Sequence, residues 1–346
     1  MLNNSDLVIS GIGLLTTYGE GKEHFLNGYS NHNESYGIIK DLLVSNYKIK
    51  EIRYLNRTSV IAVIAALLCL RDGNFLVDES NEDSIGVSLG SAYGCFNSCK
   101  EFYLDALENG FVYVNPAFYP NTMMTAPASH IAIQLGCKGV NKTISNGAVS
   151  GIDAIGFGMD LIKMNCIEMI LAGGCDEIIT DHENRFNTRT SEGGCIFLIE
   201  GYESAVQRSA PIYAKLLAYD SCFVNKVDGV EKICDVIYRI ISNSTYNLQD
   251  IAGISIESNG NAVVSEALIH ALKGINPSFL IKLNEISKLN GETNAASGCY
   301  QVCSSVLTGE NNKVMLTITL NRDCNCSILM FVRLAAEGKS RIGVNT

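Results

Sequence analysis

The sequence predicts a layered α/β fold in which the sheet is buried between helices. Short apolar runs that end in glycine alternate along the chain with longer stretches of helical periodicity. This alternation is typical of parallel or mixed sheets that carry helices on their faces. The chain has 346 residues, of which 47% are hydrophobic and 18% charged, so it has enough apolar material for one large core or two fused ones.

The first part of the chain contains several strands and helices in alternation. Glycine-bounded apolar runs predict the strands, and runs with a period near 3.6 residues predict the helices. The expected strands are 7–13, 84–90, 142–145, 166–174 and 194–200, and the expected helices are 24–27, 58–70, 127–135 and 150–164. A loop is expected at 91–94, directly after the second strand.

After about residue 205 a similar order of elements begins again. Strands are expected at 212–220 and 251–257, helices at 231–242 and 265–272, and further elements at 295–307 and 314–320. The second half thus repeats the order of the first without repeating its letters. We therefore predict two similar α/β halves, residues 1–205 and 206–346, packed together into one compact unit.

Composition excludes several classes of function. The formal net charge of −10 and the pI near 5.1 argue against nucleic acid and anionic membranes as partners. The longest apolar run, 58–70, is shorter than the roughly 20 residues that a membrane span needs. Thirteen cysteines are scattered mostly singly and no secretory leader is visible, which predicts a cytoplasmic protein with free thiols. No metal is expected, because Cys324-x-Cys326 has no second pair, and no cofactor is expected either.

The most specific stretch of the chain is 120–139, continued by 143–155 and by Leu171-Ala-Gly-Gly174. It resembles the beta-ketoacyl synthase family, in which a strand leads through a sharp turn to a nucleophilic cysteine at a helix N-terminus. A helix N-terminus lowers the pKa of a thiol and supplies N–H donors to an oxyanion. Aligned on Val149-Ser-Gly151, the cysteine position is occupied by Ala148, and a methyl group cannot attack a thioester.

Two further motifs of the family supply histidines that help to expel CO2 from a malonyl unit and to stabilise the resulting enolate. The segment 256–261 lies where the family has "HGTGT", which places Asn259 at the first histidine. The segment 291–298 lies where the family has "GHT", which places Glu292 at the second. The resemblance therefore implies a catalytically degenerate member in which all three catalytic positions have changed.

The resemblance covers about residues 7–333 and departs from the family at other places as well. Ser287 stands where a lysine is expected, and 320–327 replaces a loop rich in glycine and phenylalanine that normally gates the acyl thioester. The segments 181–191 and 220–250 are shorter than in the family. In the family these regions usually carry elements that line the dimer interface and elements of the substrate lid.

The family implies a thiolase-like fold, with two similar halves forming a five-layered α-β-α-β-α core. It also implies a function: a chain-length-factor-like subunit of a type II polyketide or fatty-acid synthase. Such a subunit forms a heterodimer with an active ketosynthase and shapes the tunnel that holds the growing acyl chain. Because acyl carrier proteins are acidic, we expect the carrier protein to dock mainly on the partner rather than on this acidic chain. The expected dimer surface is 143–165.

The residues leave other interpretations open. Ala148 also fits an engineered Cys-to-Ala replacement, but the changes at Asn259 and Glu292 argue against it, because an engineered change would rarely alter all three positions. Asn259 fits a turn or cap residue, and Glu292 fits either a dipole-stabilised carboxylate or a residue that forms a salt bridge to the partner subunit or caps the following helix. An active acyltransferase or malonyl decarboxylase that uses Glu292 or Asn259 is the rival enzyme hypothesis, and a scaffold without a tunnel is a third. Cys175 and Cys195 are interpreted as buried hydrophobes rather than reactive thiols, and His130 as a core histidine.

Overall fold

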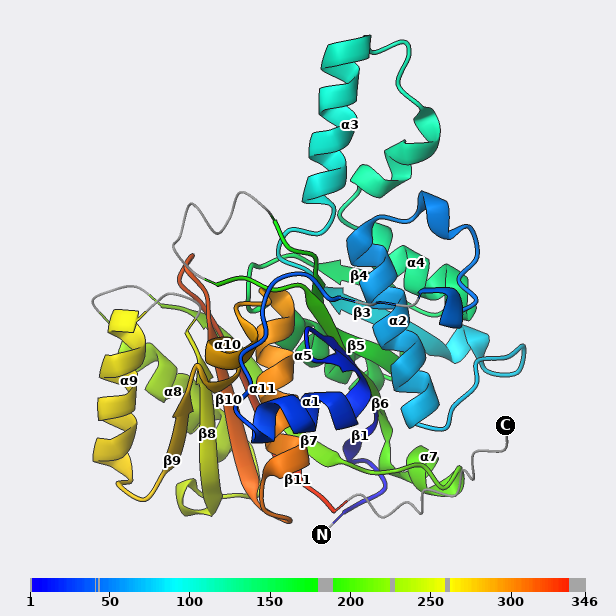
Figure 1. The fold of residues 1–346 in the computed structure, drawn as a ribbon. Helices are drawn as coiled ribbons and strands as arrows, with labels where there is room; N and C mark the ends of the chain where they lie inside the picture. The colour runs from blue at the N-terminus through cyan, green and yellow to red at the C-terminus, as the bar shows by residue number, and fades with distance from the viewer. Residues whose placement is uncertain are drawn as a thin grey trace.

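The strands of the described residues form one mixed sheet, with the order β4-β3-β5-β6-β1-β7-β11-β10-β8-β9 and with β2 paired to β1 (Figure 1). The structure is a computed structural model, and it describes residues 2–40, 42, 44–179, 189–224, 228–258 and 262–335. The strands are β1 (Leu7–Thr16), β2 (Gly19–Glu20), β3 (Ile85–Gly90), β4 (Asn141–Ile144), β5 (Met169–Asp176), β6 (Gly193–Gly201), β7 (Ala214–Phe223), β8 (Ile251–Glu257), β9 (Leu280–Leu283), β10 (Val314–Leu320) and β11 (Asn325–Arg333).

The sheet consists of two five-stranded arrays with the same topology. In β4-β3-β5-β6-β1 the first three strands are parallel and the last two join antiparallel, and the same holds for β9-β8-β10-β11-β7. A short antiparallel pairing of β1 with β7, from Leu7↔Leu216 to Ile9↔Ala214, connects the two arrays. The repeated order of elements is therefore a repeated strand order, whereas the domain limits at residue 205 stay a prediction.

Helices separate and cover the two arrays. They are α1 (Gly21–Ser30), α2 (Arg57–Asp72), α3 (Phe96–Asn109), α4 (Ala126–Leu135), α5 (Ser150–Lys163), α7 (Tyr202–Gln207), α8 (Gly229–Ser242), α9 (Ala262–Ile275), α10 (Glu285–Asn290) and α11 (Ala295–Thr308). α5 and α11 lie between the arrays, α2 and α4 cover the outer face of the first, and α8 and α9 cover the outer face of the second (Figure 1). These layers confirm the expected five-layered α-β-α-β-α core.

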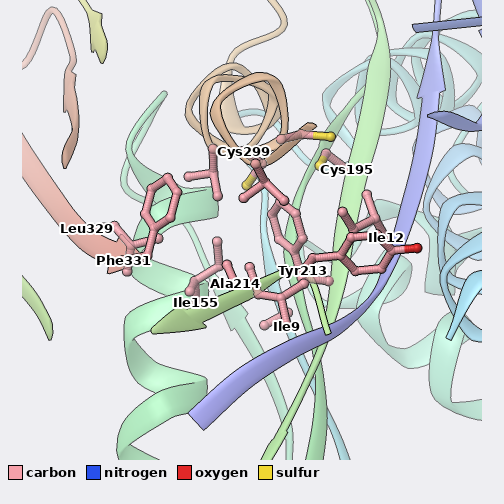
Figure 2. Packing of buried hydrophobic residues seen from close by; sticks show 14 of the residues in the cluster. Ile9, Ile12, Ile155, Cys195, Tyr213, Ala214, Cys299, Leu329 and Phe331 are labelled. Atoms are coloured by element: carbon pink, nitrogen blue, oxygen red, sulfur yellow. The ribbon is translucent and has the colours of Figure 1, made fainter. Parts of the chain in front are cut away.

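The central layer holds a large apolar cluster. Ile9 and Ile12 from β1, Ile155 from α5 and Phe331 from β11 pack together there, all at 1% exposure or less (Figure 2). β1 is buried along its whole length because it lies where the two arrays meet. This burial explains why its sequence reads as a continuous apolar run rather than an alternating one.

Several elements were not expected from the sequence. The largest is α3, which together with a following 3-10 helix, η4 (Pro116–Thr122), projects from the body of the molecule (Figure 1). Only Ala106 of α3 is buried, so the helix lacks the apolar face against a core that sequence patterns detect. The strands β9 and β11 were also missed, β11 because its start was assigned to a loop. Among the described residues, no helix is long and apolar enough to cross a membrane.

Candidate functional site

Ala148 lies in the turn between β4 and α5, with 2% of its surface exposed. The turn is tight, because Gly147 adopts the left-handed region at a φ of +62°. Ser150 closes it: its Oγ accepts a hydrogen bond from the Asn146 N–H at 2.7 Å and donates one to the Gly147 carbonyl at 2.6 Å. The structure therefore places a methyl group at the N-terminus of a helix that is buried between the two arrays.

The turn is held on both sides by polar side chains from distant elements. Asn146 Nδ2 donates to Asp153 at 2.9 Å, and Asp153 also accepts from the Tyr219 hydroxyl at 2.8 Å. On the other side, Asn321 Nδ2 donates to the Asn146 carbonyl at 2.9 Å. The position of Ala148 thus depends on β7 and on the turn between β10 and β11.

The start of α11 lies directly against the first turn of α5. A Cβ added to Gly151 or to Gly174 would come within 2.1 Å of the Ala295 carbonyl oxygen, so both positions need glycine. Two chain segments that are far apart in the sequence therefore meet closely beside Ala148. The segment that precedes α11 carries Glu292.

Glu292 forms an ion pair with Arg322, whose Nη2 lies 2.9 Å and 3.2 Å from the two carboxylate oxygens. The residue is 8% exposed. Its backbone is fixed too, because its N–H donates to the Arg189 carbonyl and its carbonyl accepts from the Ser191 N–H, both at 2.8 Å. Glu292 therefore forms a salt bridge within the chain, whereas the sequence interpretation expected one to the partner subunit or a helix cap.

The turn from Asn321 to Cys324 brings two of the three sequence-predicted site residues together. Asn321 contacts the turn that holds Ala148, and Arg322 pairs with Glu292. This turn occupies the place of the gating loop that the family resemblance leads one to expect. Asn259, the third predicted position, lies outside the described residues.

Asp176 is a site residue that the sequence interpretation missed. Its buried carboxylate accepts hydrogen bonds from the Ser91 hydroxyl at 2.6 Å and from the backbone N–H groups of Ala92, Tyr93 and Ala295 at 3.0–3.1 Å. Burial raises the pKa of Asp176, and these hydrogen bonds oppose the rise. The residue ties the loop after β3 to the start of α11. Its signal was an acidic residue directly at the carboxyl end of a buried strand.

Of the other candidate groups, the two cysteines are buried in the core, whereas His130 is only partly buried. Cys175 and Cys195 are 0% exposed, and burial raises the pKa of both thiols well above the usual value. Burial likewise lowers the pKa of His130 on α4. Within the described ranges, no group of three or more histidine, cysteine or acidic side chains could hold a metal ion. The buried-hydrophobe interpretation of the two cysteines agrees with these surroundings.

The chain is similar to known proteins in both sequence and structure. Residues 41–189 match the family model of the beta-ketoacyl synthase N-terminal domain. The chain is 22% identical over 381 residues to 3-oxoacyl-[acyl-carrier-protein] synthase 2 of Staphylococcus aureus strain COL, covering 95% of this chain and 92% of the relative. It is 24% identical over 256 residues to the synthase of the same name from Vibrio harveyi, covering 62% of each.

Solved structures agree with the sequence relatives. The ishigamide ketosynthase/chain length factor superposes with a TM-score of 0.80 at 18% identity, covering 95% of this chain and all of the other. A type II polyketide-synthase ketosynthase in complex with its acyl-carrier protein superposes at 0.82 with 17% identity, and a beta-ketoacyl synthase from Burkholderia phymatum does the same. Coverage is 96% of this chain and 100% of the other in both cases. The fold is therefore the thiolase-like fold of ketosynthases. Residues 41–189 thus match the beta-ketoacyl synthase family, and the rest of the chain shares its fold.

Proposed function

We propose that this chain is the non-catalytic, chain-length-factor-like partner of an active ketosynthase, and that it shapes the acyl tunnel of a carrier-protein-dependent chain-elongating enzyme. The observation that carries the proposal is the methyl group of Ala148 at the N-terminus of α5, with Glu292 paired to Arg322 at the second histidine position. The three positions Ala148, Asn259 and Glu292 are those where the family has its cysteine and two histidines.

The chemistry of these side chains supports a catalytically inactive site. Holding an acyl chain as a thioester needs a nucleophile, and the Ala148 methyl group is not one. Ser150, two residues further on, is fully buried, and its hydroxyl is engaged in closing the turn. A carboxylate accepts hydrogen bonds but does not donate them, so an ionised Glu292 would repel the enolate that an imidazole stabilises.

Two exposed features support pairing with another subunit. β4 is the last strand of its array and pairs only with β3 in the described part of the chain, so its outer edge is open to another strand. The projecting segment 96–123 exposes large apolar side chains, which mark interaction sites. These are Phe96, Tyr103, Leu104, Leu107, Phe111, Val112, Tyr113, Phe118, Tyr119 and Met123.

The net charge of −10 supports an assignment of roles between the two subunits. Acyl carrier proteins are acidic, and like charges facing each other across an interface disfavour binding. We therefore infer that the carrier protein docks mainly on the active ketosynthase. This chain would complete the dimer and form part of the wall of the acyl tunnel.

Substitution of Tyr103 by aspartate is expected to weaken pairing by tenfold or more. Tyr103 is 58% exposed on α3, and a charge there would have to be desolvated when the surface is covered. The chain is co-expressed with the ketosynthase encoded beside it, and complex formation is followed by size exclusion and titration. Leu76→Asp is the matched control, because Leu76 is also apolar and exposed but lies outside the projecting segment. A wild-type chain that stays monomeric in the presence of this ketosynthase contradicts the proposal.

The Ala148→Cys variant is expected to remain inactive in condensation and in malonyl decarboxylation. A restored thiol would still lack the two histidines, because Asn259 and Glu292 occupy their positions. The measurement is release of CO2 and formation of acetyl carrier protein from malonyl carrier protein, for the wild-type chain and the variant. Turnover by the wild-type chain that disappears in Glu292→Ala would favour the rival hypothesis of an unusual decarboxylase.

A further inference from the structure

A cavity of about 400 Å³ lies between the projecting helix α3 and the first turn of α2. Side chains of α3, η4 and the segment 53–57 form its walls, and Glu177, directly after β5, also lines it. The lining does not include Ala148, Glu292 or Arg322. The cavity is therefore distinct from the candidate site described above.

Two buried hydrogen-bond acceptors in the lining of this cavity have no donor. They are Oε1 of Glu177 and Oδ1 of Asn121, in side chains that belong to residues 6% and 5% exposed. The amide of Asn121 cannot simply be reversed, because its Nδ2 already donates to the Tyr54 carbonyl. Buried polar groups nearly always have a partner, so two orphaned acceptors among the residues that line one cavity favour a ligand that donates hydrogen bonds. The terminal torsion of a glutamate is broad, so the carboxylate of Glu177 can reorient when a ligand binds.

The charges around the cavity favour a cationic donor. Glu101 and Asp105 of α3 line it together with Glu177, which makes three carboxyl groups. Of the two arginines in the lining, Arg57 pairs with Glu192 and also interacts with Glu177, so Arg53 and a shared Arg57 face the three carboxyl groups and Glu192. Arg53 itself stacks on the Tyr54 ring, at 4.6 Å from the ring centroid.

The remaining lining is partly apolar and partly formed by the neutral polar residues Asn56, Asn97, Ser98 and Asn115. Leu55, Phe102 and Phe118 form the apolar part of the wall. A ligand that fits both parts has a positively charged, hydrogen-bonding head and a short apolar body. We propose that this cavity binds a small organic cation, a primary ammonium carried on an apolar group, with the ammonium donating to Glu177 and Asn121.

The test uses 2-phenylethylamine as the probe and isothermal titration at about pH 8 with the full chain. Saturable binding is expected, with the neutral analogue 2-phenylethanol about tenfold weaker or more, because hydrogen bonds to charged groups are the stronger ones. Glu177→Gln should weaken amine binding by about tenfold or more. Glu101→Gln, at an exposed position of α3, should weaken it a few-fold without disturbing the fold. Glu203→Gln, an exposed residue of α7 that does not line the cavity, should leave binding unchanged.

The pH dependence provides a second readout. Burial raises the pKa of Glu177 to about 7. A side-chain hydrogen bond with Asn97 opposes this rise, and the negative charges of Glu192, Asp176 and Glu101 add to it. Arg57 also faces this carboxyl group. The carboxyl group is therefore largely protonated at about pH 6 and ionised at about pH 8, whereas an alkylammonium with a pKa near 10 stays charged. Amine affinity is expected to rise across this range in the wild-type chain and to stay flat in Glu177→Gln. Equal binding of the alcohol, absence of saturable amine binding, or binding that neither Glu177→Gln nor Glu101→Gln weakens would overturn the proposal.

Discussion

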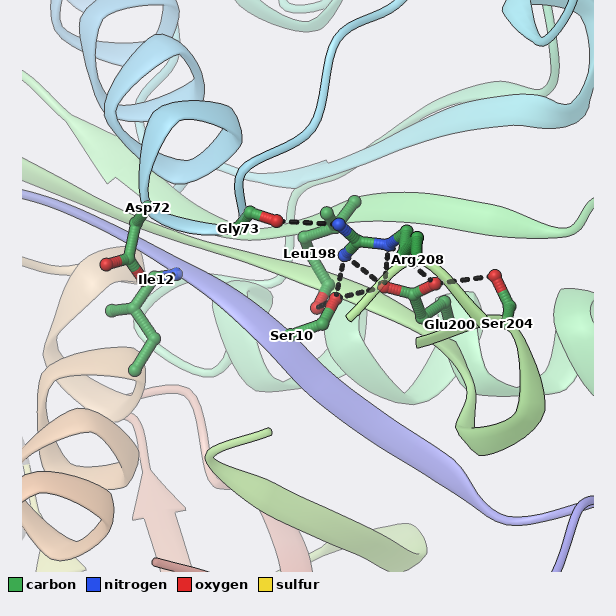
Figure 3. Close-up of polar contacts among 8 residues, drawn as sticks. All are labelled: Ser10, Ile12, Asp72, Gly73, Leu198, Glu200, Ser204 and Arg208. Carbon is green, nitrogen blue, oxygen red and sulfur yellow. Dashed lines mark hydrogen bonds and ion pairs between the residues drawn. The ribbon is translucent and has the colours of Figure 1, made fainter. Parts of the chain in front are cut away.

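Arg208→Ala is expected to lower the free energy of unfolding by about 3–5 kcal/mol. Arg208 pairs with Glu200, whose side chain is completely buried (Figure 3). The Nε of Arg208 lies 3.0 Å and 3.1 Å from the two carboxylate oxygens, and its other nitrogens donate to the Gly73 carbonyl at 2.6 Å and to the Ser10 hydroxyl at 3.0 Å. Removing the guanidinium leaves a charge in the interior without its cation, together with an unpartnered carbonyl.

The measurement is urea unfolding of the chain at neutral pH, followed by circular dichroism. The control is Lys232→Ala, which breaks the exposed ion pair of Lys232 with Asp228 and should cost about 0–1 kcal/mol. Similar destabilisation by the two variants would show that the Glu200 network contributes no more than a surface pair.

Phe331→Ala is expected to destabilise the chain by about 3–5 kcal/mol as well. The Phe331 side chain is 0% exposed and packs in the central layer, where β11 faces α5 and α11 (Figure 2). Truncation removes apolar contacts and leaves a cavity. Because β11 is hydrogen-bonded to β10 on one side and to β7 on the other, the backbone has little freedom to close it. Thermal and urea unfolding report the change.

Phe111→Ala provides the matched control for this substitution. Phe111 is 72% exposed in the projecting segment, so the same truncation should change the stability of the isolated chain by no more than about 0.5 kcal/mol. If the projecting segment is a subunit interface, Phe111→Ala should instead weaken pairing with the ketosynthase. A large loss of stability in the isolated chain would show that Phe111 is covered within the chain.

Much of the fold could be predicted from local sequence patterns. The strand β8 begins and ends at the predicted residues, 251–257, because an apolar run bounded by polar residues defines a buried strand within a short window. The strand β10 has the bounds of the element expected at 314–320, whose type was not predicted. The turn before α5 was predicted for a similar reason. Asn146-Gly147 is a turn signal between a strand and a helix, and the left-handed Gly147 confirms it.

Elements without a buried apolar face escaped prediction. α3 buries only Ala106, and the exposed aromatic residues of its segment follow no pattern that a core would impose. In a sequence such residues are indistinguishable from packed ones, since hydrophobicity alone does not state what covers a side chain. The tertiary structure was needed to show that they face outward.

By itself, the sequence determined the repeated α/β order, the resemblance to ketosynthases and the presence of alanine, asparagine and glutamate at three informative positions. Only the tertiary structure decided what surrounds them. Glu292 meets Arg322 across 30 residues of sequence, and Glu177 and Asn121 meet at one cavity although 56 positions separate them. Hydrophobic periodicity is a local property, whereas ion pairs and cavities arise from the packing of elements that are distant along the chain, so no window of the sequence contains them.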